Sequence, residues 1–353
     1  MSEKPPASLT TMPPHVRWVQ AGPVSLLVNV RTLGLTAGVL AGVAILGLWG
    51  LTLGSFPLSL ADVVGSLVGA GPAGAEFIVL DLRLPRLLTA LLVGGLLALA
   101  GAVFQGLVRN PLVSPDVIGI NAGASVAAAL WIVTGRAPAL LPAAAFAGAL
   151  GAAAAVYLLS WRGHVSPPRL VLVGIGVNAL LTACTTFLVI RAEIHEASRA
   201  VLWMTGSVYG SDWGDVRILA SVLALLAPAA VGLARPLRLM HTGDATARSL
   251  GLPLERTRLA LVVVGCGLSG VAVSAAGPVG FVALVAPHLA RMLAGPASGG
   301  VLVLAGALGA ALLLGADLAG QHALPVDLPA GVLTAAVGAP YFLFLLYRTH
   351  ARL

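Results

Sequence analysis

Side chains able to carry out covalent, metal or nucleotide chemistry are sparse in this sequence. The two cysteines, Cys184 and Cys266, stand alone in apolar runs, with no second thiol or histidine at the spacing of a metal site. We therefore interpret them as buried, inert residues. The only lysine is Lys4, so the chain lacks the Gly-Lys-Ser/Thr sequence with which a glycine-rich loop holds a nucleoside triphosphate. Any energy from ATP must reach this chain through a partner.

Polar residues inside apolar segments could form a proton or ion relay, the usual device of secondary transporters and pumps. The candidates are Asp116, Asn178, His288 and Asp317. Three of them lie near the ends of predicted spans, where an interfacial position satisfies them. A single amide such as Asn178 is typical of a hydrogen bond between helices. These residues therefore predict no ion pathway.

The elements that hold these residues are membrane helices. Of the 353 residues, 58% are hydrophobic and 9% are charged, whereas a soluble domain carries about 25% charged residues. Most of the exterior must therefore face lipid. Small residues such as Gly94, Gly101 and Gly309 predict close helix packing. We predict ten spans: 33–53, 87–107, 116–134, 139–160, 170–190, 216–234, 259–276, 279–294, 301–319 and 330–347.

The distribution of basic residues predicts the orientation. With a cytoplasmic N-terminus, fourteen of the 20 Lys and Arg residues fall inside, and six fall outside: Arg83, Arg86, Arg136, Arg191, Arg199 and Arg217. Short loops rich in Arg stay inside, so both termini are expected in the cytoplasm. Topology explains the net charge of +7 better than nucleic-acid binding, because the arginines form no basic stripe. We predict a mobile tail over 1–30, without a cleavable signal peptide, and one membrane domain over 31–353.

The loops between the spans differ in kind. Three outer segments carry acidic residues and are expected to form short interfacial helices and loops: 54–83, 191–215 and 320–329. The largest inner loop is 235–258. There, Asp244 after Gly243 can cap a short helix, Gly251 can terminate it, and Pro253 can begin a second turn. We predict two short amphipathic helices on the cytoplasmic face.

Four ordered blocks of sequence closely resemble the FecCD family, the permease subunits of bacterial ABC importers for ferric siderophores, haem and vitamin B12. The first block begins with Leu-Arg-Leu-Pro-Arg-Leu at 82–87 and continues through Arg-Asn-Pro-Leu-Val-Ser-Pro-Asp at 109–116. The other three blocks are 243–253, 277–291 and 327–342. Only the N-terminal tail falls outside the resemblance.

The resemblance implies an all-α, ten-span subunit of the vitamin B12 permease type, with halves that form an inverted repeat. It implies a multi-pass protein of the bacterial cytoplasmic membrane. The expected partners are a second permease subunit, identical or paralogous, two cytoplasmic ATPase subunits and an extracytoplasmic substrate-binding protein. The ATPase would use ATP and Mg, whereas this chain would bind no cofactor or metal and catalyse no reaction.

The resemblance also assigns a coupling segment. In the family, the inner loop between spans six and seven lies in a cleft of the ATPase, and it matches 243–253 here. Gly243 and Gly251 would permit the tight ends, and Arg248 would be the polar contact. The matched coupling residues are Gly243, Asp244, Ala247, Arg248, Leu250, Gly251, Leu252 and Pro253.

Two further sites follow from the resemblance. Arg83 and Arg86 match outer arginines that meet acidic residues of the binding protein, a role that suits the bidentate pairing of arginine with carboxylate. A third family arginine is replaced here by Gln321, which departs from a three-point docking pattern. The gate turn between spans four and five also departs from the B12 permease, because prolines stiffen it; its residues are Ser166, Pro167 and Pro168.

The leading hypothesis is an importer permease for a ferric siderophore. The segments 203–208 and 338–342 look closer to siderophore members of the family than to the B12 member. Vitamin B12 or haem is the alternative substrate. A secondary transporter acting alone is a rival of another class, and the segment 243–253 separates the two, because only an ABC permease depends on it. A membrane-embedded enzyme or sensor is disfavoured by the lack of a polar catalytic cluster.

Overall fold

The computed structural model describes residues 16–21, 24–163 and 165–350. Two short antiparallel strands precede the first long helix, β1 (Val16–Ala21) and β2 (Val24–Asn29). The side chain of Asn29 then accepts a hydrogen bond from the Thr32 amide and caps that helix. Part of the segment predicted as a tail therefore forms paired strands, which suit a valine-rich stretch. Residues 1–15 lie outside the described residues.

Among the described residues, seven helical segments are long and apolar enough to cross a membrane. The second is a continuous run of α3 (Ala73–Phe77), a π-helix η2 (Ile78–Arg83) and α4 (Leu84–Val108). The third joins the short 3₁₀ helix η4 (Pro138–Leu140) to α6 (Leu141–Ser160). The other five are α1 (Val30–Thr52), α7 (Pro167–Arg191), α9 (Trp213–Met240), α11 (Leu254–Ala276) and α13 (Gly299–His322).

Three shorter apolar helices complete the set within the described part of the chain. They are α5 (Ile120–Val133), α12 (Val282–Ala294) and α14 (Ala330–His350). The 3₁₀ helix η3 (Pro115–Ile118) precedes α5. Each of the ten apolar segments predicted from the sequence therefore coincides with a helix.

The predicted boundaries were wrong where charged residues or prolines lie within a helix. The span expected at 87–107 is continuous with helix that begins before Arg83 and Arg86. The span expected at 216–234 continues to Met240, through Pro236. Arginine stems can lie along an apolar helix surface while their charged ends reach water, so a charge near the interface does not end a helix.

Helix α4 lies at the centre of the bundle, and α7 lies at its edge. In the most apolar window of each span, 78% of the residues are buried in the α4 segment and 11% in α7. Cys266 is buried in α11, as predicted, whereas Cys184 is exposed on α7, which corrects its predicted burial. The peripheral position of α7 explains the difference.

Glycines bring backbones into contact around α4. A methyl group added at Gly94 would lie 2.3 Å from the carbonyl oxygen of Gly309 on α13. One added at Gly101 would lie 1.8 Å from the carbonyl oxygen of Ala283 on α12. The close packing predicted from small residues is therefore confirmed at these two crossings.

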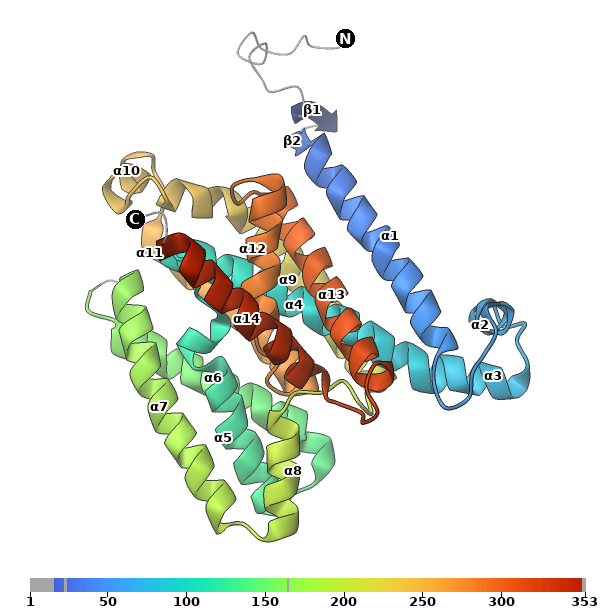
Figure 1. The fold of residues 1–353 in the computed structure, drawn as a ribbon. Coiled ribbons are helices and arrows are strands. Elements are labelled where there is room, and N and C mark those ends of the chain that lie inside the picture. Colours follow the sequence, from blue (N-terminus) through green and yellow to red (C-terminus); the bar gives the residue numbers. More distant parts are fainter. Residues whose placement is uncertain (1–15, 22–23, 164, 351–353) are drawn as a thin grey trace.

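Short helices mark the two ends of the molecule. At one end lie α2 (Leu60–Leu67), α3 and α8 (Ile194–Met204), in the segments where short outer helices were predicted. At the other end lies α10 (Asp244–Ser249), together with the strand pair and the C-terminal end of α14 (Figure 1). The predicted coupling loop is therefore on the same end as both described chain termini.

Candidate functional site

The predicted coupling segment forms one short helix between two glycines. Gly243 precedes α10 with φ of +106°, and Gly251 follows it with φ of +82°. Both φ values lie in the positive region that favours glycine, which suits the tight ends predicted there. The prediction of two short helices was wrong, because α9 already occupies 235–240 and Pro253 is the residue directly before α11.

One face of α10 is buried and the other is exposed. Ala247 is fully buried, and the Leu252 amide donates to its carbonyl oxygen at 3.1 Å. Arg248 is exposed, as is the apolar side chain of Leu250. An exposed leucine beside an exposed arginine, on a helix with fixed ends, is a surface suited to a protein partner.

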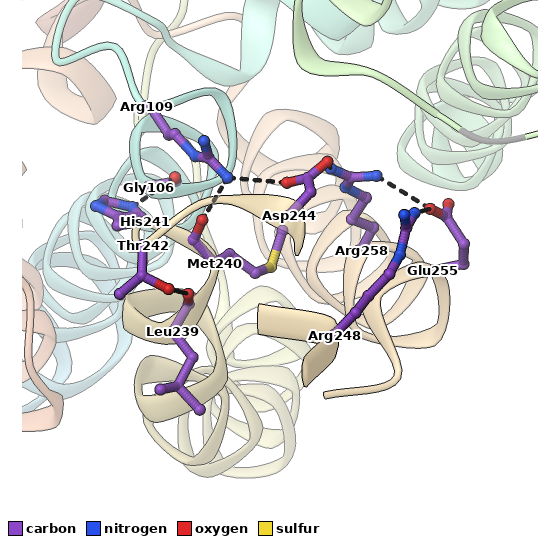
Figure 2. Close-up of polar contacts among 10 residues, drawn as sticks. All are labelled: Gly106, Arg109, Leu239, Met240, His241, Thr242, Asp244, Arg248, Glu255 and Arg258. Atoms are coloured by element: carbon purple, nitrogen blue, oxygen red, sulfur yellow. Dashed lines mark hydrogen bonds and ion pairs between the residues drawn. The ribbon is translucent and has the colours of Figure 1, made fainter. Parts of the chain in front are cut away.

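Asp244 holds α10 to the bundle through two arginines (Figure 2). Its Oδ2 accepts a hydrogen bond from Arg258 of α11 at 2.6 Å, and its Oδ1 accepts one from Arg109 at 3.0 Å. Arg109 follows α4 and also donates to the carbonyl oxygen of Met240, at the end of α9. Asp244 was expected to cap α10, but Gly243 is the capping residue and the carboxylate of Asp244 instead links three helices.

The charges around Asp244 change its acidity. Partial burial raises the pKa of its carboxyl, but the hydrogen bonds and positive charges of Arg258 and Arg109 together outweigh burial. The net result is a pKa below the usual value of 3.8. Asp244 is therefore ionised throughout the physiological pH range and keeps its ion pairs there.

Arg258 is the central residue that the sequence analysis missed. Its side chain is 2% exposed, and it donates to Glu255 Oε1 at 3.0 Å as well as to Asp244. Arg248 also lies 3.9 Å from Glu255 Oε1, so the predicted ATPase contact already has a carboxylate neighbour in this chain. The sequence feature that could have indicated this ion pair is the spacing of Glu255 and Arg258, which lie three residues apart at the start of a helix.

The predicted gate turn lies beside this cluster. Ser166 directly precedes α7, and Pro167 and Pro168 occupy its first turn. Just before them, the Val165 amide donates to Glu255 Oε2 at 3.4 Å. The structure therefore brings the predicted coupling segment and the predicted gate turn to the same end of the molecule, joined through Glu255.

The predicted docking arginines lie at the opposite end and already have partners within the chain. Arg83 donates to the carbonyl oxygens of Leu51 and Phe56 at 2.7 and 2.6 Å. Arg86 forms a bidentate pair with Asp317 at 2.8 and 3.1 Å. Gln321 donates to the same carboxylate at 2.8 Å. The Asp317 side chain is 3% exposed and that of Arg86 is 21% exposed.

These residues line a cavity of about 730 Å³ between the end of α1, α4 and α13. Tyr209 forms part of the wall, with its ring centroid 5.5 Å from the Arg86 guanidinium carbon. Because the fork of Arg86 is occupied by Asp317, a docking partner would meet a neutralised pair rather than a free cation. Both oxygens of the Asp317 carboxylate have hydrogen-bond donors, which supports its interpretation as a paired residue near the end of a span and not as part of an ion relay.

The other polar candidates also have local partners. Asp116 accepts a hydrogen bond from the Ser114 hydroxyl at 3.0 Å, and Asn178 donates to the Asp116 carbonyl oxygen at 3.3 Å. His288 packs against the Tyr341 ring, with 6.2 Å between ring centroids. Asn178 therefore joins α7 to η3, which is the interhelical role predicted for it.

With the geometry known, comparison with known proteins identifies the fold and class. The FecCD transport family matches residues 41–348. The chain belongs to the FecCD transport family. As a FecCD protein it is a membrane-embedded permease subunit, a transporter rather than an enzyme.

Relatives of this FecCD chain are close and cover nearly all of it. It is 42% identical over 339 residues to the achromobactin transport system permease protein CbrC of Dickeya dadantii, covering 95% of this chain and 97% of CbrC. It is 41% identical over 302 residues to the ferric enterobactin transport system permease protein FepG of Escherichia coli, covering 85% of this chain and 91% of FepG.

A solved structure of similar fold supports the same assignment. It is described as an inward-facing conformation of a metal-chelate type ABC transporter and matches with a TM-score of 0.82 and 28% identity. The match covers 90% of this chain and 99% of that one.

Proposed function

We propose that this chain is the permease subunit of an ABC importer that carries a ferric siderophore across the bacterial cytoplasmic membrane. The observation that carries the proposal is the exposed face of α10, fixed between Gly243 and Gly251, in a chain of the FecCD family. Its relatives CbrC and FepG are named as transport permeases for achromobactin and ferric enterobactin. A separate ATPase that binds α10 would supply the energy.

The proposed assembly contains a second permease subunit, ATPase subunits and an extracytoplasmic binding protein. The ATPase uses ATP and Mg, and this chain holds no cofactor of its own. All ten apolar helices cross the membrane, including the three shorter ones, and both termini lie in the cytoplasm. The position of the strand pair, α10 and the end of α14 at one end of the molecule supports this orientation (Figure 1).

In this proposal the partners bind at opposite ends. The ATPase contacts Arg248 and Leu250 on α10. The binding protein docks around the outer cavity, where Arg83, Arg86 and Gln321 line the wall. Because Arg86 is paired with Asp317, docking relies on shape and on the outer rim more than on a free arginine fork.

An uptake assay tests the proposal. A strain lacking the gene is supplied with radiolabelled ferric siderophores, with vitamin B12 and haem as competing candidates. We expect the intact chain to restore uptake of a ferric siderophore and Leu250→Asp, which places a charge on the exposed face of α10, to abolish it. Leu140→Asp, an exposed leucine of η4 that does not line the outer cavity, is the matched control and should retain uptake. Restoration of vitamin B12 or haem uptake alone would reject the substrate assignment.

The energy source is tested separately in proteoliposomes. We expect accumulation of the chelate when the permease is reconstituted with the ATPase and supplied with MgATP, and no accumulation when an ion gradient is the sole energy source. Uphill transport by the permease alone on a proton or sodium gradient would overturn the ABC assignment in favour of a secondary transporter.

A further inference from the structure

We propose that Arg258 is the positioning residue that transmits movement of α10 to the turn between α6 and α7, with Glu255 as the next contact. This inference rests on the proposed function, because it takes the ATPase as the source of the movement. It adds a specific route within this chain from the coupling helix to the gate turn.

The first step is the setting of Arg258. Its guanidinium is almost completely buried, whereas the two carboxylates that it binds are 39% and 32% exposed. A buried guanidinium is held in place by its carboxylate partners, since moving it away from both would leave a buried charge without compensation. The guanidinium is also planar and rigid. It therefore constrains the separation of Asp244 and Glu255, and Figure 2 shows Arg258 between the two carboxylates.

The second step is the path that these contacts form. Asp244 is the first residue of α10, and it binds Arg258 at 2.6 Å. Arg258 binds Glu255 Oε1 at 3.0 Å, and the other oxygen of that carboxylate accepts from the Val165 amide at 3.4 Å. Three contacts thus connect the start of α10 to the residue before Ser166, across a gap of 90 residues in the sequence between Val165 and Glu255.

The third step is what the segment between α10 and α11 binds. Within residues 250–253, the Gly251 and Leu252 amides donate to the carbonyl oxygens of Arg248 and Ala247 at 2.9 and 3.1 Å, so this segment is held to the C-terminal end of α10. Asp244, at the other end of α10, is held by Arg258, which also binds Glu255. The Arg258 bridge therefore connects the start of α10 to the first turns of α11 in addition to the backbone.

The fourth step is the contrast between the two arginines of Asp244. Arg109 ties Asp244 to the end of α4, the buried central helix, and its side chain is partly exposed. Arg258 binds the same carboxylate and also binds Glu255, which contacts the residue before the gate turn. Losing Arg109 therefore loosens α10 on the bundle, whereas losing Arg258 leaves, in the described part of the chain, only the longer, exposed pair of Arg248 with Glu255, at 3.9 Å, between α10 and the gate turn.

The test uses the complete importer with its ATPase and binding protein in proteoliposomes. Arg258→Met keeps an unbranched apolar stem and removes the charge and the donors of the guanidinium. We expect this variant to assemble and to hydrolyse ATP within twofold of the parent, while uptake falls at least tenfold. Arg256→Gln, an exposed arginine in the same turn, is the matched control and should leave both rates unchanged.

A second measurement follows the movement itself. The test is made in a background with Cys184→Ser and Cys266→Ala. One spin label, at Thr242→Cys, reports on the segment just before α10, and the other, at Arg162→Cys, reports on the connection between α6 and the gate turn. In the parent, both labels should change mobility when a non-hydrolysable ATP analogue and Mg are added. In Arg258→Met, the Thr242 label should still respond and the Arg162 label should not.

The outcomes separate the two proposals. If neither label responds in the parent complex, coupling through α10 is wrong and the proposed function fails. If both labels respond in Arg258→Met as they do in the parent, the Arg258 route is wrong and the proposed function stands. Should Arg258→Met fail to assemble, Glu255→Gln tests the same route at a partly exposed site, with an expected three- to tenfold loss of uptake at unchanged ATP hydrolysis. Full uptake in Glu255→Gln would overturn the route.

Discussion

Two arginine–carboxylate clusters stand at opposite ends of this permease, and they are built in opposite ways. At the end proposed to face outward, the carboxylate of Asp317 is buried and Arg86 is partly exposed; this is the outer cluster. At the end proposed to be cytoplasmic, Arg258 is buried and the carboxylates of Asp244 and Glu255 are partly exposed; this is the inner cluster. The outer cluster joins two long helices, α4 and α13, that are already in backbone contact at Gly94. The inner cluster joins a six-residue helix flanked by glycines.

The difference teaches that the same ion-pair chemistry serves two purposes here. Between helices that are already packed, a buried pair adds to the stability of a fixed crossing. Beside a short helix that is not packed into the bundle along its length, it determines which other elements that helix can move. Variants of the outer cluster should therefore lower stability, and variants of the inner cluster should separate ATP hydrolysis from transport.

The largest effect on stability is expected at Asp317. Asp317→Asn leaves Arg86 without its charged partner in a mostly buried position, which should lower the free energy of unfolding by about 3 kcal/mol. An SDS titration of the purified chain in mixed micelles measures this. Asp327→Asn, an exposed acidic residue at the same end, is the control and should change the value by less than about 0.5 kcal/mol. Equal values for the two variants would contradict the structural role of the outer cluster.

A smaller stability effect is expected at the inner cluster. Arg109→Gln removes its bonds to Asp244 and to the Met240 carbonyl oxygen at a partly exposed site, so the expected loss is about 1 kcal/mol. The same titration measures the loss, and the ratio of ATP hydrolysed to chelate imported should rise in the reconstituted importer. If Arg109→Gln lowered the free energy of unfolding by about 3 kcal/mol or more and left the ratio of ATP hydrolysed to chelate imported unchanged, the distinction between the two clusters would be wrong.

The acid sensitivity of the inner cluster is expected to be confined to low pH. The pKa of Asp244 is below 3.8 in the folded chain, so its ion pairs contribute fully above that value and are lost as pH falls through the folded pKa. Stability measured between pH 7 and pH 4 should therefore show no step from Asp244, and a further loss should appear below pH 4. Asp244→Asn should remove that further loss. A step near pH 6 that disappears in Asp244→Asn would show that the pKa is raised instead.

The smallest effect is expected at Gln321. Gln321→Ala removes the hydrogen bonds of its amide to the carboxylate and to the carbonyl oxygen of Asp317, while the bidentate pair with Arg86 remains, so the free energy of unfolding should fall by about 0.5 to 1 kcal/mol. Chelate uptake per folded molecule should stay unchanged. A severalfold loss of uptake at normal stability would instead indicate that Gln321 contacts the binding protein.

The sequence was sufficient to predict the helices but not the clusters. Long apolar runs predict membrane helices because of their length and hydropathy; each of the ten runs coincides with a helix, and in the described part of the chain seven helical segments are long and apolar enough to cross a membrane. Gly243 and Gly251 were identified because turn geometry is a local property. The pair of Arg86 and Asp317 spans 231 residues, and no local pattern reports such a distance. Arg258 was counted among the basic residues of the cytoplasmic side, since composition does not distinguish a buried arginine from an exposed one.

The contact between Gly101 and the Ala283 carbonyl has a consequence for how the importer opens. With no space for even one methyl group, α4 and α12 cannot approach further, and sliding either past the other would force backbone atoms together. The same restriction applies where α4 crosses α13. Alternating access is therefore expected to leave these three helices nearly fixed relative to one another. The change in pore shape is expected to come from α7, which has few buried residues and begins at the gate turn.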